Sequence, residues 1–252
     1  MINNSILHLE NVCKHFGGVV AGKNITLDVQ QGKIYGLIGP NGAGKTTLMN
    51  IISGIYIPDS GTIYFDGKDI TNTPAHIRSR IGIARTFQVP RFMQRSSIKD
   101  NLLLAAEINS DRGALSIFRK EKSGFDQELN ELLRIANLEF DWSDDINSLP
   151  FGKRKLLEIV RSLLTHPKVI LVDEPAAGLN NKEMEYVAAL LEFAAKKKNI
   201  GVMLIEHSME LVMNLCEEII VLCFGEVISR GLPEEIAENP MVIEAYLGDE
   251  QL

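Results

Sequence analysis

Three patterns in the sequence predict an α/β fold with a parallel-sheet core, an antiparallel β layer and a helical insertion. Residues 6–32 alternate strand-like runs with a turn. Residues 90–161 carry apolar side chains at helical spacing. From Val169 onward strands alternate with helices, which is typical of a parallel sheet, because parallel neighbours need crossover connections.

The length and composition allow one large domain. The chain has 252 residues, of which 45% are hydrophobic, enough for a core with a substantial insertion. We expect a single domain over residues 1–252, in which residues 1–89 and 162–252 form the core and residues 90–161 form the helical subdomain.

The antiparallel layer is predicted from short alternating runs. Residues 6–9 and 25–29 read as strands, with a turn at Phe16-Gly17-Gly18 between them. Residues 61–65 read as a further strand that ends in Asp66-Gly67, a strong hairpin-turn signal. Later in the chain we expect strands at residues 169–173, 201–205 and 218–223, and helices at residues 181–197 and 208–215.

A glycine-rich octet lies between an apolar strand at residues 33–38 and a helix that starts near Thr47. It reads Gly39-Pro40-Asn41-Gly42-Ala43-Gly44-Lys45-Thr46. Glycines let the backbone N–H groups approach a triphosphate, and the helix N-terminus adds a positive dipole end. Lys45 is expected to reach the β- and γ-phosphates and Thr46 to ligate Mg²⁺, with Thr47 beside them. The alternative, a chance glycine-rich turn, leaves the flanking strand and helix unexplained, so we predict a P-loop NTPase.

A second candidate site segment is the run Val169-Ile170-Leu171-Val172-Asp173-Glu174, four apolar residues followed by two acids. Asp173 is expected to hold Mg²⁺ through water, and Glu174 to polarise an attacking water. A buried strand that merely ends in solvated acids is the alternative, which the phosphate loop makes less attractive.

Composition and charge disfavour several function classes. The net charge of −7 argues against nucleic acid as a partner, since such binders usually carry a basic footprint. No stretch is apolar for long enough to span a membrane, and the N-terminus lacks the pattern of a signal peptide. The three cysteines have no close-paired spacing, so reduced thiols in the cytoplasm are expected.

Further motifs resemble the ATP-binding subunit of ABC transporters over nearly the whole chain. They are Gln88 in Ala84-Arg85-Thr86-Phe87-Gln88, His207 after the strand at residues 201–205, and Glu174-Pro175-Ala176-Ala177-Gly178-Leu179-Asn180. The resemblance implies a RecA-like core and a head-to-tail dimer that encloses two ATP molecules. It also implies that Phe16 stacks on adenine, that Gln88 contacts Mg²⁺ and that His207 contacts the γ-phosphate. Taken singly, a Phe is usually core and a Gln usually surface.

One motif departs from this family. Where its members have Leu-Ser-Gly-Gly-Gln at the start of a helix, this chain has Leu149-Pro150-Phe151-Gly152-Lys153. Gly152 is expected to keep its contact with the nucleotide of the partner subunit. Pro150 fits the first helical turn but supplies neither hydroxyl nor amide. We therefore hypothesise a weakened contact across the dimer and a partner that is a different ATP-binding subunit.

Within the family the chain resembles the importers of branched-chain, or hydrophobic, amino acids. The ending Asn239-Pro240-Met241-Val242-Ile243-Glu244-Ala245-Tyr246-Leu247-Gly248 carries this resemblance most specifically. Such importers imply two transmembrane permease subunits, two different ATPase subunits and an extracytoplasmic solute-binding protein. The expected location is the cytoplasmic face of the cell membrane, and residues 89–92 beside Gln88 are expected to receive a permease helix.

Other functions stay open at this point. Related subunits serve urea and other small solutes, and exporters or lipid-extraction systems use a similar engine. A soluble ABC ATPase that acts on DNA or ribosomes is less favoured, because such proteins usually carry two fused halves or long coiled coils. A scaffold that binds ATP without splitting it is disfavoured by Asp173, Glu174 and His207.

Overall fold

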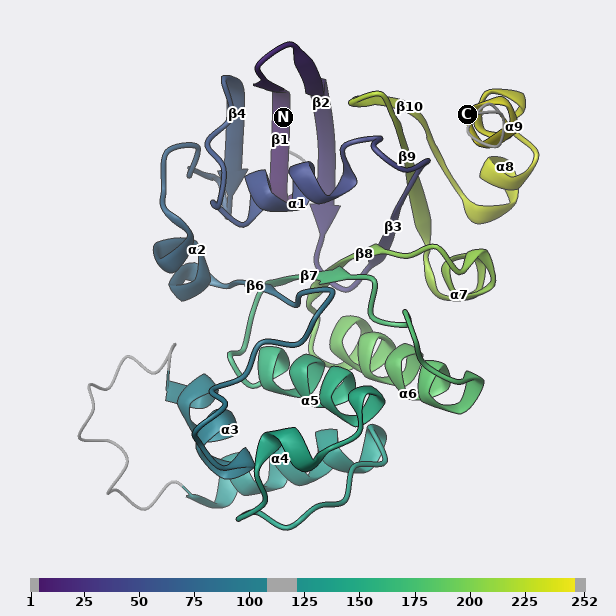
Figure 1. The fold of residues 1–252 in the computed structure, drawn as a ribbon. Helices are drawn as coiled ribbons and strands as arrows, with labels where there is room; N and C mark the ends of the chain where they lie inside the picture. The colour runs from purple at the N-terminus through teal and green to yellow at the C-terminus, as the bar shows by residue number, and fades with distance from the viewer. Residues whose placement is uncertain (1–4, 108–121, 248–252) are drawn as a thin grey trace.

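A computed structural model describes residues 5–107 and 122–247. Within these residues the chain forms two sheets with helices around them (Figure 1). The helices are α1 (Lys45–Ile52), α2 (Ala75–Ile81), α3 (Ile98–Glu107), α4 (Lys122–Ile135), α5 (Phe151–Leu163), α6 (Asn181–Glu192), α7 (Met209–Leu215), α8 (Pro233–Ala237) and α9 (Pro240–Leu247). Among the described residues, no helix is both long and apolar enough to cross a membrane.

The antiparallel layer has the strand order β2-β1-β4-β5. Its strands are β1 (Ser5–Phe16), β2 (Val19–Gln30), β4 (Ser60–Phe65) and β5 (Lys68–Asp69). The turn between β1 and β2 contains Gly17-Gly18, as predicted, and brings Phe16 opposite Val19. Asp66 and Gly67 both have positive φ, 52° and 72°, as a tight two-residue hairpin turn requires.

The second sheet has the order β10-β9-β3-β8-β7-β6. Its strands are β3 (Ile34–Ile38), β6 (Ile83–Arg85), β7 (Val169–Asp173), β8 (Gly201–Ile205), β9 (Glu218–Cys223) and β10 (Glu226–Gly231). All neighbours are parallel except β10, which runs antiparallel to β9. The carboxyl ends of β3, β6, β7 and β8 therefore share one edge of the sheet, where ligands bind in open α/β sheets.

Strand β3 separates two apolar clusters because its side chains alternate between the faces of the sheet. Ile34 and Ile38 pack with α5, α6 and α7 in one cluster. Tyr35 and Leu37 pack in the other, together with α1 and the inner face of the antiparallel layer. Helix α1 thus lies between the two sheets, which fixes the loop that precedes it.

The helical region lies at the opposite end of the molecule from β1, β2 and β4 (Figure 1). Helices α3, α4 and α5 pack around shared apolar residues that include Leu102, Leu132 and Leu157. Helix α5 continues to Leu163, and the subdomain boundary at residues 161–162 stays a prediction.

Two local expectations are corrected. The predicted helix over 181–197 is α6, followed by a π-helical turn at Phe193–Lys197. Pro150 precedes α5 as its N-cap, with ψ of 152°, and does not lie in the first turn. A proline without N–H is tolerated there because that N–H has no helical partner. Of the predicted C-terminal motif, Gly248 lies outside the described residues.

Candidate functional site

The glycine-rich loop connects β3 to α1 and leaves no room for larger residues at two positions. A Cβ on Gly39 would lie 1.9 Å from the carbonyl oxygen of Leu222, and one on Gly44 would lie 2.4 Å from that of Ala21. Gly39, Gly42 and Gly44 all have positive φ. The loop is therefore built from backbone that only glycine adopts without strain, as a close approach to phosphate requires.

Lys45 folds over this loop. Its Nζ donates to the carbonyl oxygens of Gly39 at 2.5 Å and Pro40 at 2.9 Å, and the side chain is buried. Thr46 is exposed and Thr47 half-buried on the first turn of α1, which contains no acidic residue. The N-terminal end of α1 is positive and presents a lysine, so it can bind an anion. The two threonine hydroxyls beside it can bind a hard cation that accompanies the anion.

Two predicted site residues contact the carboxylate of a third, Glu174. Gln88 Nε2 donates to Glu174 Oε2 at 2.8 Å, and His207 Nε2 lies 3.1 Å from Glu174 Oε1. Glu174 has φ of 46°, and its N–H donates to the carbonyl oxygen of Ile205 at 2.9 Å. The side chains that follow β6, β7 and β8 thus converge where the shared sheet edge places them. Asp173, the last residue of β7, lies beside them, and Arg85 pairs with it at 3.0 Å.

Two charged residues that the sequence reasoning missed support this arrangement. Glu206 is buried and accepts from the N–H groups of Ala176 at 2.6 Å and His207 at 3.0 Å. Lys155 on α5 is buried too, and its Nζ donates to the main-chain oxygen of Glu174 at 2.6 Å. Burial lowers the pKa of Lys155. An acid directly after the buried run 201–205 was the only available signal for Glu206.

Comparison with known protein families shows to which family the chain belongs. The model of the family described as ABC transporter matches residues 22–177, more than half of the chain. The chain belongs to the ABC transporter family. A second model, described as branched-chain amino acid ATP-binding cassette transporter, matches residues 226–251 of this cassette.

The cassette also matches curated relatives over nearly its full length. It is 36% identical to the high-affinity branched-chain amino acid transport ATP-binding protein BraF of Pseudomonas aeruginosa, covering 98% of this chain and 100% of the relative. The same values hold for LivG of Escherichia coli, which has the same description.

The cassette also superposes on solved structures of ATP-binding cassettes. An ATP-binding cassette in its ADP conformation superposes with a TM-score of 0.81 at 33% identity, covering 97% of this chain and 99% of that one. A dimeric cassette bound to ADP and Pi superposes with a TM-score of 0.75 at 28% identity, covering 90% and 98%. The cassette is thus an ATPase with the parallel-sheet fold that the sequence predicts.

Two predicted site residues lie away from the convergence at Glu174. Phe16, 42% exposed, ends β1 and meets the ring of Tyr56 edge-on at 5.1 Å. Gly152 lies in the first turn of α5, and a Cβ there would be 2.2 Å from Glu183 Oε1. A side chain at position 152 would displace the Glu183 carboxylate, which accepts from the N–H of Asn180 at the start of α6, so Gly152 has a packing role besides its predicted role toward the partner.

The C-terminal helix reaches the phosphate loop, which the sequence did not reveal. Tyr246 on α9 packs against the cluster around β3, and its hydroxyl interacts with the backbone of Gly39. Burial raises the pKa of this hydroxyl. The segment that matches the branched-chain amino-acid model therefore contacts the first glycine of the nucleotide site.

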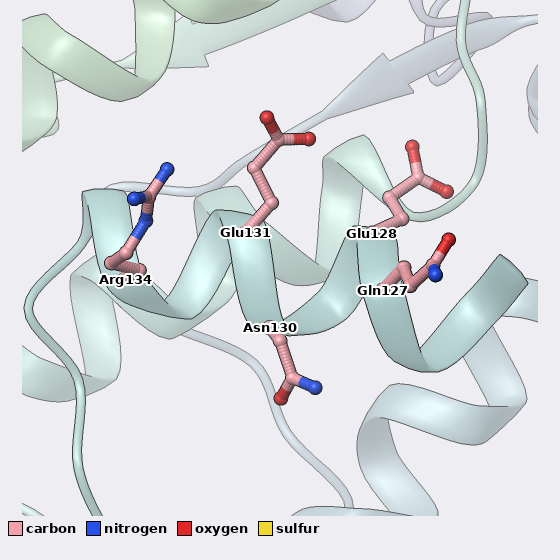
Figure 2. A pocket seen from close by; sticks show the side chains of 5 residues that line it. All are labelled: Gln127, Glu128, Asn130, Glu131 and Arg134. Atoms are coloured by element: carbon pink, nitrogen blue, oxygen red, sulfur yellow. The ribbon is translucent and has the colours of Figure 1, made fainter. Parts of the chain in front are cut away.

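A hollow along α4 does not have the features of a nucleotide site. Its lining side chains are Gln127, Glu128, Asn130, Glu131 and Arg134. Figure 2 shows that they all come from α4 and that Asn130 points away from Glu131. Glu128 is paired with Lys198 at 2.7 Å. These groups do not converge, in contrast to the groups around Glu174.

Proposed function

We propose that this cassette is the ATP-hydrolysing subunit of an importer for branched-chain or other hydrophobic amino acids. The observation that carries the proposal is the convergence of Gln88 and His207 on Glu174 beside an intact phosphate loop. The match of residues 226–251 to the branched-chain amino-acid model supports the cargo class, as do the names of the full-length relatives.

In this mechanism Lys45 and the loop N–H groups bind the phosphates of ATP. Glu174 orients a water molecule in line with the γ-phosphate and accepts its proton. Gln88 and His207 fix the orientation of that carboxylate in the structure. Lys155 and the main-chain oxygen of Ile205 hold the backbone from which it projects. His207 is also proposed to contact the γ-phosphate.

The residues present fit a magnesium ion. Thr46, Asp173 and Gln88 offer hydroxyl, carboxylate and carboxamide oxygens, the hard donors that Mg²⁺ prefers. Asp173 would act through water. When bound, Mg²⁺ neutralises charge on the β- and γ-phosphates during transfer.

Partner subunits follow from the same proposal. A second cassette, different from this one, would pack head to tail so that its signature helix covers this ATP, while Gly152 covers the other ATP. Here Pro150 gives α5 no side-chain cap, Phe151 is 39% exposed, and Lys153 Nζ lies 3.4 Å from the main-chain oxygen of Glu139. These features lack the hydroxyl and amide that would reach a partner's phosphate, which favours an asymmetric dimer.

Two transmembrane permeases would anchor the cassette at the cytoplasmic face of the membrane, with a solute-binding protein outside. The segment after Gln88 offers an apolar docking surface, because Val89 is 66% and Met93 39% exposed. A hollow of about 180 Å³ beside it is lined by Met93, Leu104 and Ala105 of the helical region and by Arg85. A short permease helix with apolar residues fits such a surface.

The test is to purify the tagged chain from detergent-solubilised membranes of its native cell and identify what accompanies it. We expect two different multi-span permeases and a second ATP-binding subunit. Uptake assays with leucine, isoleucine and valine would then define the cargo. Recovery of the chain alone, or with ribosomal or DNA-bound proteins, would overturn the transporter assignment. Uptake of urea or export of a lipid would overturn the assignment of the cargo.

A further inference from the structure

Arg85, the last residue of β6, is a buried cation that contacts two motif-bearing elements. Its Nη2 donates to Asp173 Oδ2 at 3.0 Å, and the side chains of both residues are only 7% exposed. Its Nη1 donates to Asn50 Oδ1 at 2.6 Å and to Ser53 Oγ at 3.1 Å. Asn50 lies in the second half of α1, the helix that follows the phosphate loop, and Ser53 is the C-cap of that helix.

This arrangement depends on the shape of arginine. The planar guanidinium presents several N–H donors in a rigid fork, so one side chain bonds Asp173 with one nitrogen and α1 with another. A lysine ammonium is a single point charge on a flexible stem and does not reproduce this fork. Asp173 is therefore held at a fixed position relative to α1, which carries Thr46.

Arg85 also leads into the segment that ends at Gln88. Its guanidinium carbon lies 5.3 Å from the centre of the Phe87 ring, and that of Arg91 lies 4.7 Å from the same ring. The N–H of Arg91 donates to the buried carboxylate of Glu158 on α5 at 3.3 Å. A continuous set of contacts thus runs from Asp173 past Gln88 to the helical region.

We propose that Arg85 is a positioning residue for the magnesium ion of the Mg²⁺–ATP complex. It orients the Asp173 carboxylate and fixes its distance to α1, so that carboxylate and hydroxyl are in place before the metal arrives. This inference rests on the proposed function, since it concerns the metal that accompanies ATP. Partners that orient metal-ligating groups typically change metal affinity by about 10- to 100-fold when they are removed.

The test separates metal binding from nucleotide binding in the purified full chain. A fluorescent ATP analogue is titrated in EDTA and then at increasing Mg²⁺, and Mn²⁺ binding to the ATP-loaded chain is followed by electron paramagnetic resonance. For Arg85→Met we expect metal affinity to fall about tenfold, with nucleotide affinity in EDTA changed by less than about twofold. Arg85→Lys should lose nearly as much, because it keeps the charge and loses the fork.

Two further variants keep the test decisive. Asn50→Ala removes an anchor of Arg85 without touching Asp173, and it should weaken metal binding in the same direction even if Arg85→Met does not fold. Arg80→Met on α2 removes an equally charged but exposed side chain, and it should leave metal affinity unchanged. Unchanged metal affinity in Arg85→Met and Asn50→Ala would overturn the inference. Failure of the wild-type chain to bind the analogue at all would instead overturn the proposed function.

Discussion

The side-chain amide of Gln88 donates to the carboxylate of Glu174 at 2.8 Å. Gln88 leads into the helical region and Glu174 follows β7, so the bond connects these two parts of the fold. This contact joins the element expected to meet the permease to the group expected to act on water. A displacement of the segment after Gln88 would therefore be transmitted directly to Glu174.

Glu174→Gln should abolish hydrolysis while preserving ATP binding. Glutamine has the same shape and can keep its hydrogen bonds to Gln88 and His207, but it cannot accept a proton from water. Loss of a general base typically costs about 10²- to 10⁴-fold in rate. Turnover and nucleotide affinity are measured in parallel, with the exposed Glu185→Gln as control. Turnover at the wild-type rate would refute the assignment of Glu174.

Lys45→Ala should weaken nucleotide binding itself. Hydrogen bonds between charged groups contribute about 1.5–3 kcal/mol, which corresponds to a loss of roughly 10- to 100-fold in affinity. The affinity for a fluorescent ATP analogue in EDTA is the measurement, because it excludes effects on the metal. The exposed Lys99→Ala should bind as the wild type does. Equal affinity of Lys45→Ala and wild type would show that the phosphates lie elsewhere.

Restoring the signature motif should raise activity. Replacing Pro150 by Ser and Lys153 by Gln supplies a hydroxyl and an amide at the start of α5, and ATP turnover of the assembled complex should increase. Serine at this N-cap should also stabilise the helix by about 1 kcal/mol, since Pro150 makes no side-chain cap. A higher melting temperature without faster turnover would mean that α5 does not contact the partner's nucleotide.

Glu158 should make stability depend on pH. Burial raises its pKa from 4.5 to about 6. The folded state then binds the proton more tightly, so this contribution to stability is fully present below pH 4.5 and is lost as the pH rises through about 6. From pH 7.5 to 4.5, the wild type should gain about 2 kcal/mol relative to Glu158→Gln.

Urea unfolding at several pH values measures this difference, with the exposed Glu139→Gln as control for the loss of one carboxylate. A difference between wild type and Glu158→Gln that does not vary with pH would contradict the assignment.

Arg78 should be the most costly side chain of α2 to remove. It is fully buried, and it donates to the main-chain oxygens of Ile51 and Ile52 at the end of α1. It also donates to the main-chain oxygens of three residues before α2: Ile70, Thr71 and Thr73. Arg78→Met removes all of these hydrogen bonds, and only the oxygens of Ile51 and Ile70 keep a backbone donor, from Gly54 and Thr73. The free energy of unfolding should therefore fall by about 3–5 kcal/mol. Urea unfolding is compared with the exposed Arg80→Met, and equal stability of the two variants would contradict this role.

The sequence predicted the framework well because its signals were local. Strand β7 is a run of apolar residues that ends in acids, and the phosphate loop has a fixed spacing, so both could be identified without tertiary information. The contacts of Gln88 and His207 with Glu174 were not predicted; the structure shows them at the shared edge of the parallel sheet.

Buried polar contacts could not be predicted in the same way. Arg85, Lys155 and Glu206 find their partners through tertiary packing, on elements far apart in the chain. No periodicity encodes such pairs, since a charged residue at a strand end or within a helix is usually solvated. Pro150 was misplaced by one position for a related reason, because helix ends are the least distinct feature of a sequence pattern.

The contact between Tyr246 and Gly39 gives the phosphate loop a connection to the surface. Helix α9 carries Tyr246 on its packed side and Met241, 57% exposed, on its outer side. A fluorophore attached at position 241 would therefore sit on the same short rigid element that touches the loop, yet outside the nucleotide site. Occupancy of the site could then be followed optically in the intact assembly, without labelling the nucleotide or altering a residue that binds it.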